Sequence, residues 1–128
     1  MKTVQKLTLD DARIVMTAAE KKAREIDVDI ATMLDVFGTP EMSKEEVEQA
    51  VQETISRAPA SLEAAEQTML NGPIQGGIHS DLRKQSAVGM AEHEFAIHPI
   101  GGIVPLMERQ RYRELVEIIL ACREHIPW

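Results

Sequence analysis

Hydrophobic and polar positions near the start of the chain repeat with the period of an α-helix. Small or apolar residues recur at alternating spacings of four and three, with charged side chains between them. This spacing predicts one buried stripe on a surface helix, formed by Ala12, Met16, Ala19, Ala23 and Ile26. Thr8 precedes the stripe, and its hydroxyl is suited to cap the free amides of a first turn. We therefore predict a helix that begins at Thr8.

Residues 27–37 permit two interpretations. The helical stripe can continue through Ile30, Met33 and Phe37, but the resulting helix of about 30 residues would far exceed the usual 11–12. The same segment also alternates with the period of a strand. Several of its alternating positions are β-branched, which favours a strand; these are Val28, Ile30, Thr32 and Val36. The strand is the preferred interpretation, followed by a turn at 35–38.

The next segment carries clear signals for the start and the end of helices. Ser43 and Glu46 have the spacing of a capping box, in which each side chain reaches the other's backbone amide. Pro59 lacks an amide donor and clashes with the preceding turn, so we predict that this helix ends there. A further helix is predicted over residues 61–70, and the Asn-Gly-Pro sequence that follows is a strong stop.

Residues 73–105 differ in composition from the rest of the chain, because six of the seven glycines lie at positions 72 to 102. Short apolar pieces at 87–90 and 95–97 are candidate strands. Residues 80–94 can alternatively form a helix, and the pattern alone leaves both interpretations open.

A last amphipathic helix is predicted from about residue 107 to residue 124. Its apolar face would contain Tyr112, Leu115, Val116, Ile119 and Cys122. The whole pattern predicts an α+β fold, a helix-rich single domain over residues 1–128 with a small antiparallel sheet. The alternative is a mainly α-helical bundle.

Charge and composition narrow the expected partners and location. The net charge is −7, and a surface of this sign repels nucleic-acid phosphates. Arg109, Arg111 and Arg113 are interleaved with polar and acidic residues and fit a solvated helix face, so no nucleic-acid partner is expected. No apolar run approaches the roughly 18 residues of a membrane span, and no secretory leader is recognisable. We therefore expect a cytoplasmic protein without a membrane partner.

Three histidines are the first candidates for chemistry. His79, His93 and His98 lie within 20 residues of one another, and imidazole suits both proton transfer near neutral pH and metal coordination. Their spacing completes no known metal motif, so the sequence names no metal.

Two glycine pairs lie in the same stretch as the histidines. Gly76-Gly77 and Gly101-Gly102 match neither a P-loop nor a dinucleotide fingerprint. Such glycines either make turns or let the backbone approach a ligand closely. The predicted cofactor-binding residues are therefore the three histidines and these four glycines. No catalytic residue is predicted, because no nucleophile and base can be paired and Cys122 lies within an apolar stripe.

Several short motifs resemble the GlcG/HbpS-like family. Residues 7–13 and 23–26 are similar to that family's opening helix, and 30–38 to the strand that follows it. Residues 72–74 and 101–106 are similar to its later glycine-rich turns. The resemblance implies a PAS/profilin-like domain that binds a cofactor-type molecule such as haem or a corrinoid and forms homo-oligomers. Haem-binding members of that family use a histidine near the N-terminal helix, whereas the first histidine of this chain is His79. The resemblance therefore supplies no ligand residue.

The sequence thus predicts a small-molecule-binding or sensing protein without clear catalytic machinery, with its pocket lined by residues 72–105. The alternative is a helical interaction subunit that homo-oligomerises or binds a protein partner. Whether the protein is an enzyme is left open.

Overall fold

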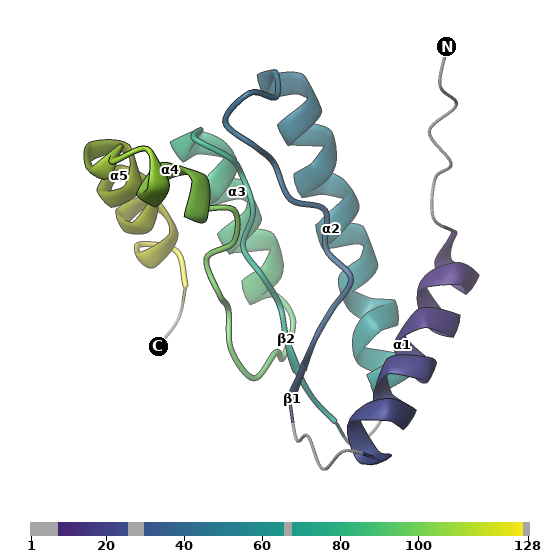
Figure 1. The fold of residues 1–128 in the computed structure, drawn as a ribbon. Helices are drawn as coiled ribbons and strands as arrows, with labels where there is room; N and C mark the ends of the chain where they lie inside the picture. The colour runs from purple at the N-terminus through teal and green to yellow at the C-terminus, as the bar shows by residue number, and fades with distance from the viewer. Residues whose placement is uncertain (1–7, 26–29, 66–67, 127–128) are drawn as a thin grey trace.

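The structure is a computed structural model that describes residues 8–25, 30–65 and 68–126. Helices and short strands follow one another along the chain (Figure 1). In chain order they are α1 (Leu9–Glu25), β1 (Ile30–Thr32), α2 (Lys44–Ala65), β2 (Met69–Asn71), α3 (Ser80–Ala91), α4 (Val104–Glu108) and α5 (Tyr112–Arg123). The predicted α+β class with many helices and a small sheet is confirmed. That residues 1–128 form one domain stays a prediction.

The sheet is parallel, so the expectation of an antiparallel sheet was wrong. Strands β1 and β2 pair in parallel, with Ala31 opposite Leu70. Parallel bridges from Asn71 to Ile97 and from Ile74 to Ile100 add a third segment on the other side of β2. The physical reason is the connection: α2 separates β1 from β2, and α3 precedes the third segment. A helix returns the chain to the starting edge of the sheet, where only a parallel strand can begin.

Helix α1 begins as predicted. The Thr8 hydroxyl accepts a hydrogen bond from the Asp11 amide at 3.1 Å, and the Asp11 carboxylate accepts one from the Thr8 amide at 2.9 Å. Of the predicted buried stripe, Ala19 is exposed and Ile26 lies outside the described residues. The side chains of Ala12, Met16 and Ala23 also lie outside what the structure describes. Among the described side chains of α1, that of Glu20 is buried.

The strand at 27–37 is confirmed for residues 30–32, while 27–29 lie outside the described residues. A continuous helix across this segment is excluded. The last sheet hydrogen bond runs from the Met33 amide to the Asn71 carbonyl at 3.1 Å. Beyond it, residues 33–39 are neither helix nor strand, so the predicted strand positions Leu34 and Val36 lie in a loop.

Helix α2 starts at the predicted capping box but does not end at Pro59. The Ser43 amide donates to the Glu46 carboxylate at 2.8 Å, and the Glu46 amide donates to the Ser43 hydroxyl at 3.2 Å. The helix then runs through Pro59 to Ala65, so the separate helix predicted over 61–70 was wrong. Its buried face continues on both sides of the exposed proline, at Val47, Ala50, Val51, Thr54, Arg57, Ala58, Ala60, Ser61 and Ala65. Burial of this face outweighs the local cost of the proline.

The helical alternative for residues 80–94 is confirmed by α3, which excludes a strand at 87–90. Residues 95–97 contribute only the single bridge at Ile97. The predicted last helix is divided into α4 and α5 by a turn in which Gln110 has a φ of 55°. On α5, Cys122 is buried as predicted, whereas Tyr112 and Val116 are exposed.

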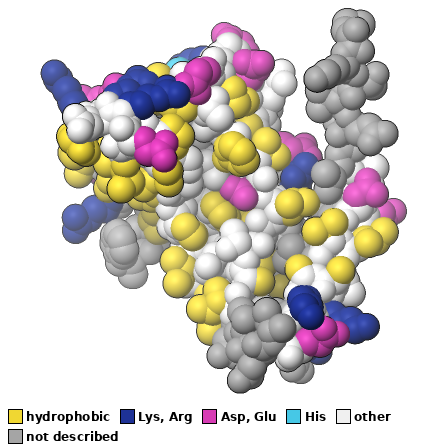
Figure 2. Space-filling view, viewed as in Figure 1, with side chains coloured by type: hydrophobic (Ala, Val, Ile, Leu, Met, Phe, Trp, Pro, Cys, Tyr) yellow, Lys and Arg dark blue, Asp and Glu magenta, His cyan; other side chains and the backbone are white. Residues whose placement is uncertain are grey.

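The core lies between the sheet and the helices α2, α3 and α5. Apolar side chains from all these elements form its main cluster: Met33, Ala58, Ala65, Leu70, Ile74, Ala87, Met90 and Cys122. Burial raises the pKa of the Cys122 thiol above its usual value. Other hydrophobic side chains gather on the surface over α4 and α5 (Figure 2). None of the described helices is both long enough and apolar enough to cross a membrane.

The exposed proline of α2 allows a test of this fold. We expect Pro59→Ala to raise the free energy of unfolding by about 1–2 kcal/mol, because alanine restores a backbone donor and removes a steric clash. The stiffer unfolded chain that proline provides offsets part of this gain. Urea denaturation measures the change, with the exposed Gln49→Ala on the same helix as a control. A loss of stability in Pro59→Ala would contradict a continuous α2.

Candidate functional site

Three parallel segments end at the same edge of the sheet. Asp35 follows β1, Gln75 follows the bridge residue Ile74, and Gly101 follows the bridge residue Ile100. The Gly101 amide donates to the Ile74 carbonyl at 2.9 Å, which keeps the second and third segments paired up to their ends. Ligands of open parallel sheets bind at the carboxyl ends of the strands. This edge is therefore the candidate site.

The side chains of Asp35 and Gln75 meet at this edge. Gln75 is only 2% exposed, and its Nε2 donates a short hydrogen bond to Oδ2 of Asp35. A Cβ at Gly101 would lie 2.1 Å from Nε2 of Gln75. Because no side chain fits at that distance, the glycine is what allows the Gln75 amide to lie across the third segment. A carboxylate and a primary amide are thus held together at the mouth of the sheet.

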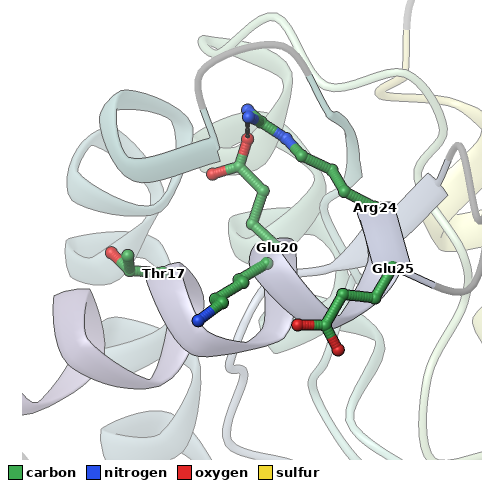
Figure 3. A pocket seen from close by; sticks show the side chains of 5 residues that line it. Thr17, Glu20, Arg24 and Glu25 are labelled. Atoms are coloured by element: carbon green, nitrogen blue, oxygen red, sulfur yellow. Dashed lines mark hydrogen bonds and ion pairs between the residues drawn. The ribbon is translucent and has the colours of Figure 1, made fainter.

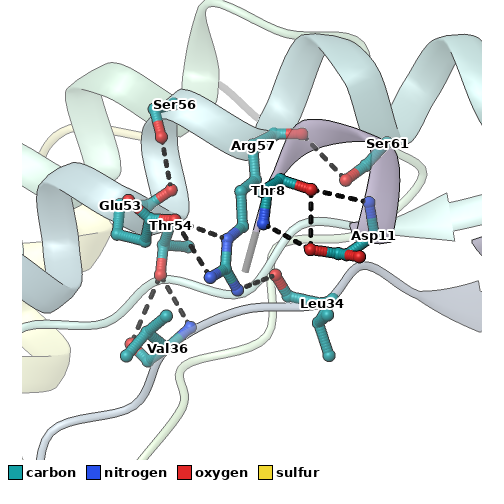
Figure 4. A network of polar contacts seen from close by, with 9 residues as sticks. All are labelled: Thr8, Asp11, Leu34, Val36, Glu53, Thr54, Ser56, Arg57 and Ser61. Atoms are coloured by element: carbon teal, nitrogen blue, oxygen red, sulfur yellow. Dashed lines mark hydrogen bonds and ion pairs between the residues drawn. The ribbon is translucent and has the colours of Figure 1, made fainter. Parts of the chain in front are cut away.

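Helix α2 holds the loop that carries Asp35 (residues 33–39). The buried Thr54 hydroxyl accepts from the Val36 amide at 2.9 Å and donates to the Val36 carbonyl at 3.3 Å. Arg57 donates to the Leu34 carbonyl at 3.3 Å, and its guanidinium is in turn paired with Glu53 at 3.0 Å. Figure 4 shows these contacts reaching from α2 to the residues on either side of Asp35.

Helix α3 holds the loop that carries Gln75 (residues 75–79) in the same way. The Ser86 hydroxyl accepts a hydrogen bond from the backbone amide of Gln75 at 3.0 Å. The Arg83 guanidinium donates through Nη1 to the Ile74 carbonyl at 2.9 Å and through Nε to the Gly77 carbonyl at 3.0 Å. Gly76 has a φ of 142°, and a Cβ there would lie 2.7 Å from the Arg83 backbone nitrogen. The loop therefore lies directly against the backbone of α3.

Two polar atoms of this group have no hydrogen-bond partner among the described residues. They are Oε1 of Gln75 and Nη2 of Arg83. Burial lowers the pKa of Arg83, although a guanidinium stays charged in proteins. Buried polar atoms without partners are rare because desolvation is costly, so both atoms are available for a ligand or for each other.

The glycines predicted for the site lie around this group. Of the three histidines, His79 ends the Gln75 loop, whereas His93 and His98 lie outside it. Gly76 and Gly77 belong to the Gln75 loop, and Gly101 and Gly102 end the third segment. His98 shares a hydrogen bond of 2.9 Å with the Gly72 carbonyl and contacts the ring of Phe95, as His93 does. His79 precedes α3 without capping it through its side chain. A cofactor-binding role for these residues stays a prediction.

No metal centre is formed by the described part of the chain, where no three His, Cys, Asp or Glu side chains are grouped suitably. A separate hollow of about 420 Å³ lies along α1 (Figure 3). In it the buried Glu20 accepts from Arg24 at 2.6 Å and from Thr68 at 3.3 Å. The described residues that line this hollow all belong to α1, and none of them belongs to the group around Gln75.

Sequence reasoning missed the central residues of the site. The sequence pattern predicts only a turn at Asp35 and marks neither Gln75 nor Arg83. The signal that could have found them is positional: Asp35 and Gln75 each follow an apolar segment of a strand–helix repeat. A parallel arrangement would have brought both to one edge.

The fold and the site define an α+β protein with parallel strands, joined by helices, that carries paired polar side chains at the strand ends. The family model described as queuine tRNA-ribosyltransferase matches residues 6–128. The chain belongs to this family.

Curated relatives from archaea give the same result. The chain is 43% identical over 106 residues to the tRNA-guanine(15) transglycosylase of Methanocaldococcus jannaschii, which covers 80% of this chain and 16% of that protein. It is 44% identical over 103 residues to the enzyme of the same name from Methanothermobacter thermautotrophicus, with the same coverage. The chain therefore spans about a sixth of the length of these relatives.

These findings correct several predictions. The resemblance to GlcG/HbpS-like proteins is wrong, because its motifs are helix starts and glycine turns that many folds share. The predicted cofactor-sensing function, with a helical interaction subunit as its alternative, is overturned by the transglycosylase relatives. The expectation of no nucleic-acid partner is also overturned, since the family is named for tRNA. Net charge bears on phosphate contacts and says nothing about recognition of a base.

The contacts from α2 can be tested by their effect on the stability of the folded protein. Thr54→Val keeps the shape of the side chain but leaves the Val36 amide without its acceptor. We expect the free energy of unfolding to fall by about 1–3 kcal/mol. The control is Ser56→Ala, which removes an exposed hydroxyl of the same helix bonded to the Glu53 carbonyl and should change stability by less than about 0.5 kcal/mol. Equal effects in chemical denaturation would contradict the role given to Thr54.

Proposed function

We propose that Asp35 and Gln75 recognise the guanine base in a protein that acts on guanine in tRNA. The observation that carries this proposal is the pairing of the two side chains at the carboxyl ends of the strands, with Nε2 of Gln75 donating to Asp35. The names of the archaeal relatives supply the substrate class. Because the chain spans 16% of those relatives, the activity and the tRNA substrate of the whole protein are part of the proposal.

The chemistry of guanine fits these two groups. Guanine presents an acceptor at O6 and a donor at its 2-amino group, with the N1–H donor between them. The Asp35 carboxylate has lone pairs to accept from both donors, while the Gln75 amide has two hydrogens. One of these hydrogens binds Asp35, and the other is free to reach O6. Adenine carries an amino group at position 6. This donor would face the NH2 group of Gln75, which is also a donor, and the contact would be unfavourable.

The glycines around the site support the same assignment. Gly101 and Gly102 leave room beside the Gln75 amide, because a Cβ at either position would lie within 3.4 Å of its atoms. A flat base can approach such a backbone closely. We assign these two glycines to the wall of the base site, and a tRNA-modifying role is consistent with the cytoplasmic location expected from the sequence.

The test is incorporation of labelled guanine into tRNA by the complete protein that contains these residues. We expect Asp35→Asn and Gln75→Leu each to lower kcat/KM for guanine about 10- to 100-fold, because each removes a charged or buried hydrogen bond to the base. The controls are Asp10→Asn and Gln52→Leu, which make the same chemical changes on exposed faces of α1 and α2.

Two outcomes would contradict the proposal. Unchanged kcat/KM in both site variants, at unchanged stability, would exclude Asp35 and Gln75 from base recognition. Activity that falls equally in the exposed controls would have the same meaning, since the effect would not be specific to the site.

A further inference from the structure

Arg83 is a buried cation, and its hydrogen bonds run to the backbone around the Gln75 loop. Its side chain is 0% exposed, and no ion pair of Arg83 is found among the described residues. Two of its nitrogens donate to the carbonyls of Ile74 and Gly77, on either side of Gln75. Burial of an unpaired charge is costly, so a role in presenting Gln75 would account for its position.

The third nitrogen of the guanidinium and the side-chain oxygen of Gln75 both lie near Gly102. The Cβ position of Gly102 is 3.4 Å from Oε1 of Gln75 and 3.8 Å from Nη2 of Arg83. Both atoms are buried, and neither forms a hydrogen bond within the described residues, to the other atom or elsewhere. At the opposite end of the same amide, Nε2 faces the Asp35 carboxylate. The Gln75 amide therefore lies between a group that only accepts and a group that only donates hydrogen bonds.

We propose that Arg83 is a positioning residue that fixes the orientation of the Gln75 amide and thereby selects a 6-oxo purine over a 6-amino purine. This inference rests on the proposed function of Gln75. A flipped amide would turn its NH2 group toward the guanidinium and its oxygen toward the carboxylate. Both contacts would then be repulsive, so the amide presents a donor, and not an acceptor, to position 6 of the base.

Arg83 matters most when the base is bound. The Asp35 carboxylate is then engaged by the donors of guanine, which weakens its control over the amide of Gln75. Arg83 does not contact the base edge in this arrangement, so its hydrogen bonds to the Ile74 and Gly77 carbonyls and its positive charge near the amide oxygen are unaffected. The guanidinium is therefore the group that preserves the donor orientation in the complex.

The experiment compares two competing bases in the guanine-incorporation assay with the complete protein. Inhibition constants are measured for unlabelled guanine and for 2,6-diaminopurine, which keeps the 2-amino group, carries a donor at position 6 and lacks the N1 hydrogen. Because that hydrogen is missing for the wild type and the variant alike, each constant is compared between the two proteins. We expect Arg83→Met to raise the inhibition constant of guanine roughly tenfold, the value of one buried hydrogen bond. The constant for 2,6-diaminopurine should stay unchanged or fall, because the released amide can turn its oxygen toward the 6-amino group.

Two controls separate positioning from general destabilisation. Ile118→Ala removes part of a buried core side chain on α5, and Arg113→Met makes the same substitution at a side chain that is 91% exposed. Both should leave the ratio of the two inhibition constants unchanged. If Arg83→Met does not fold, Arg83→Lys is used, since an ammonium cannot reproduce the planar fork and should shift the ratio in the same direction.

The results can overturn this inference separately from the proposed function. An equal rise for both bases, or no change for either, would mean that Arg83 does not set the amide orientation. In a Gln75→Leu background, Arg83→Met should have no further effect on the ratio, and an additive effect would also contradict the inference. If Gln75→Leu alone leaves guanine binding intact, the proposed function itself fails, whatever Arg83 does.

Discussion

The site depends on hydrogen bonds from buried polar side chains of α2 and α3 to the backbone of the loops that follow the strands. Thr54 and Arg57 hold the residues on either side of Asp35, and Ser86 and Arg83 hold Gln75 and the residues beside it. These loops have little regular structure of their own, so their backbone groups need other partners. The helices provide them, and the same contacts fix where the two recognition side chains point.

This arrangement explains why polar residues are placed inside the helix faces. Most of the buried polar side chains belong to these contacts, and an apolar residue at the same position would pack equally well but leave loop amides or carbonyls unsatisfied. Each helix thus has two functions. Its apolar positions cover the sheet, and its polar positions set the geometry of the strand ends, so the side chains there are held in place before any ligand binds.

Local signals predicted the helix starts well and the long-range arrangement poorly. The capping residues Thr8 and Ser43 act within one turn, so their roles are visible in sequence. Pro59 was expected to end a helix, but packing of the face on both sides of it decided otherwise. The direction of strand pairing and the meeting of Asp35 with Gln75, 40 residues apart, depend on tertiary contacts that no local pattern carries. The glycines were noticed because they are unusual, whereas an aspartate, a glutamine and an arginine are not.

The proposed function requires that the helices hold Asp35 and Gln75 in a geometry complementary to guanine. A crystal structure of the complete protein with guanine bound tests it most directly. We expect the Asp35 carboxylate to accept hydrogen bonds from N1–H and the 2-amino group, and Nε2 of Gln75 to lie within hydrogen-bond distance of O6. The contacts from Thr54 and Arg83 should persist. A base bound away from the strand ends, or one whose O6 faces a group other than Gln75, would contradict the account.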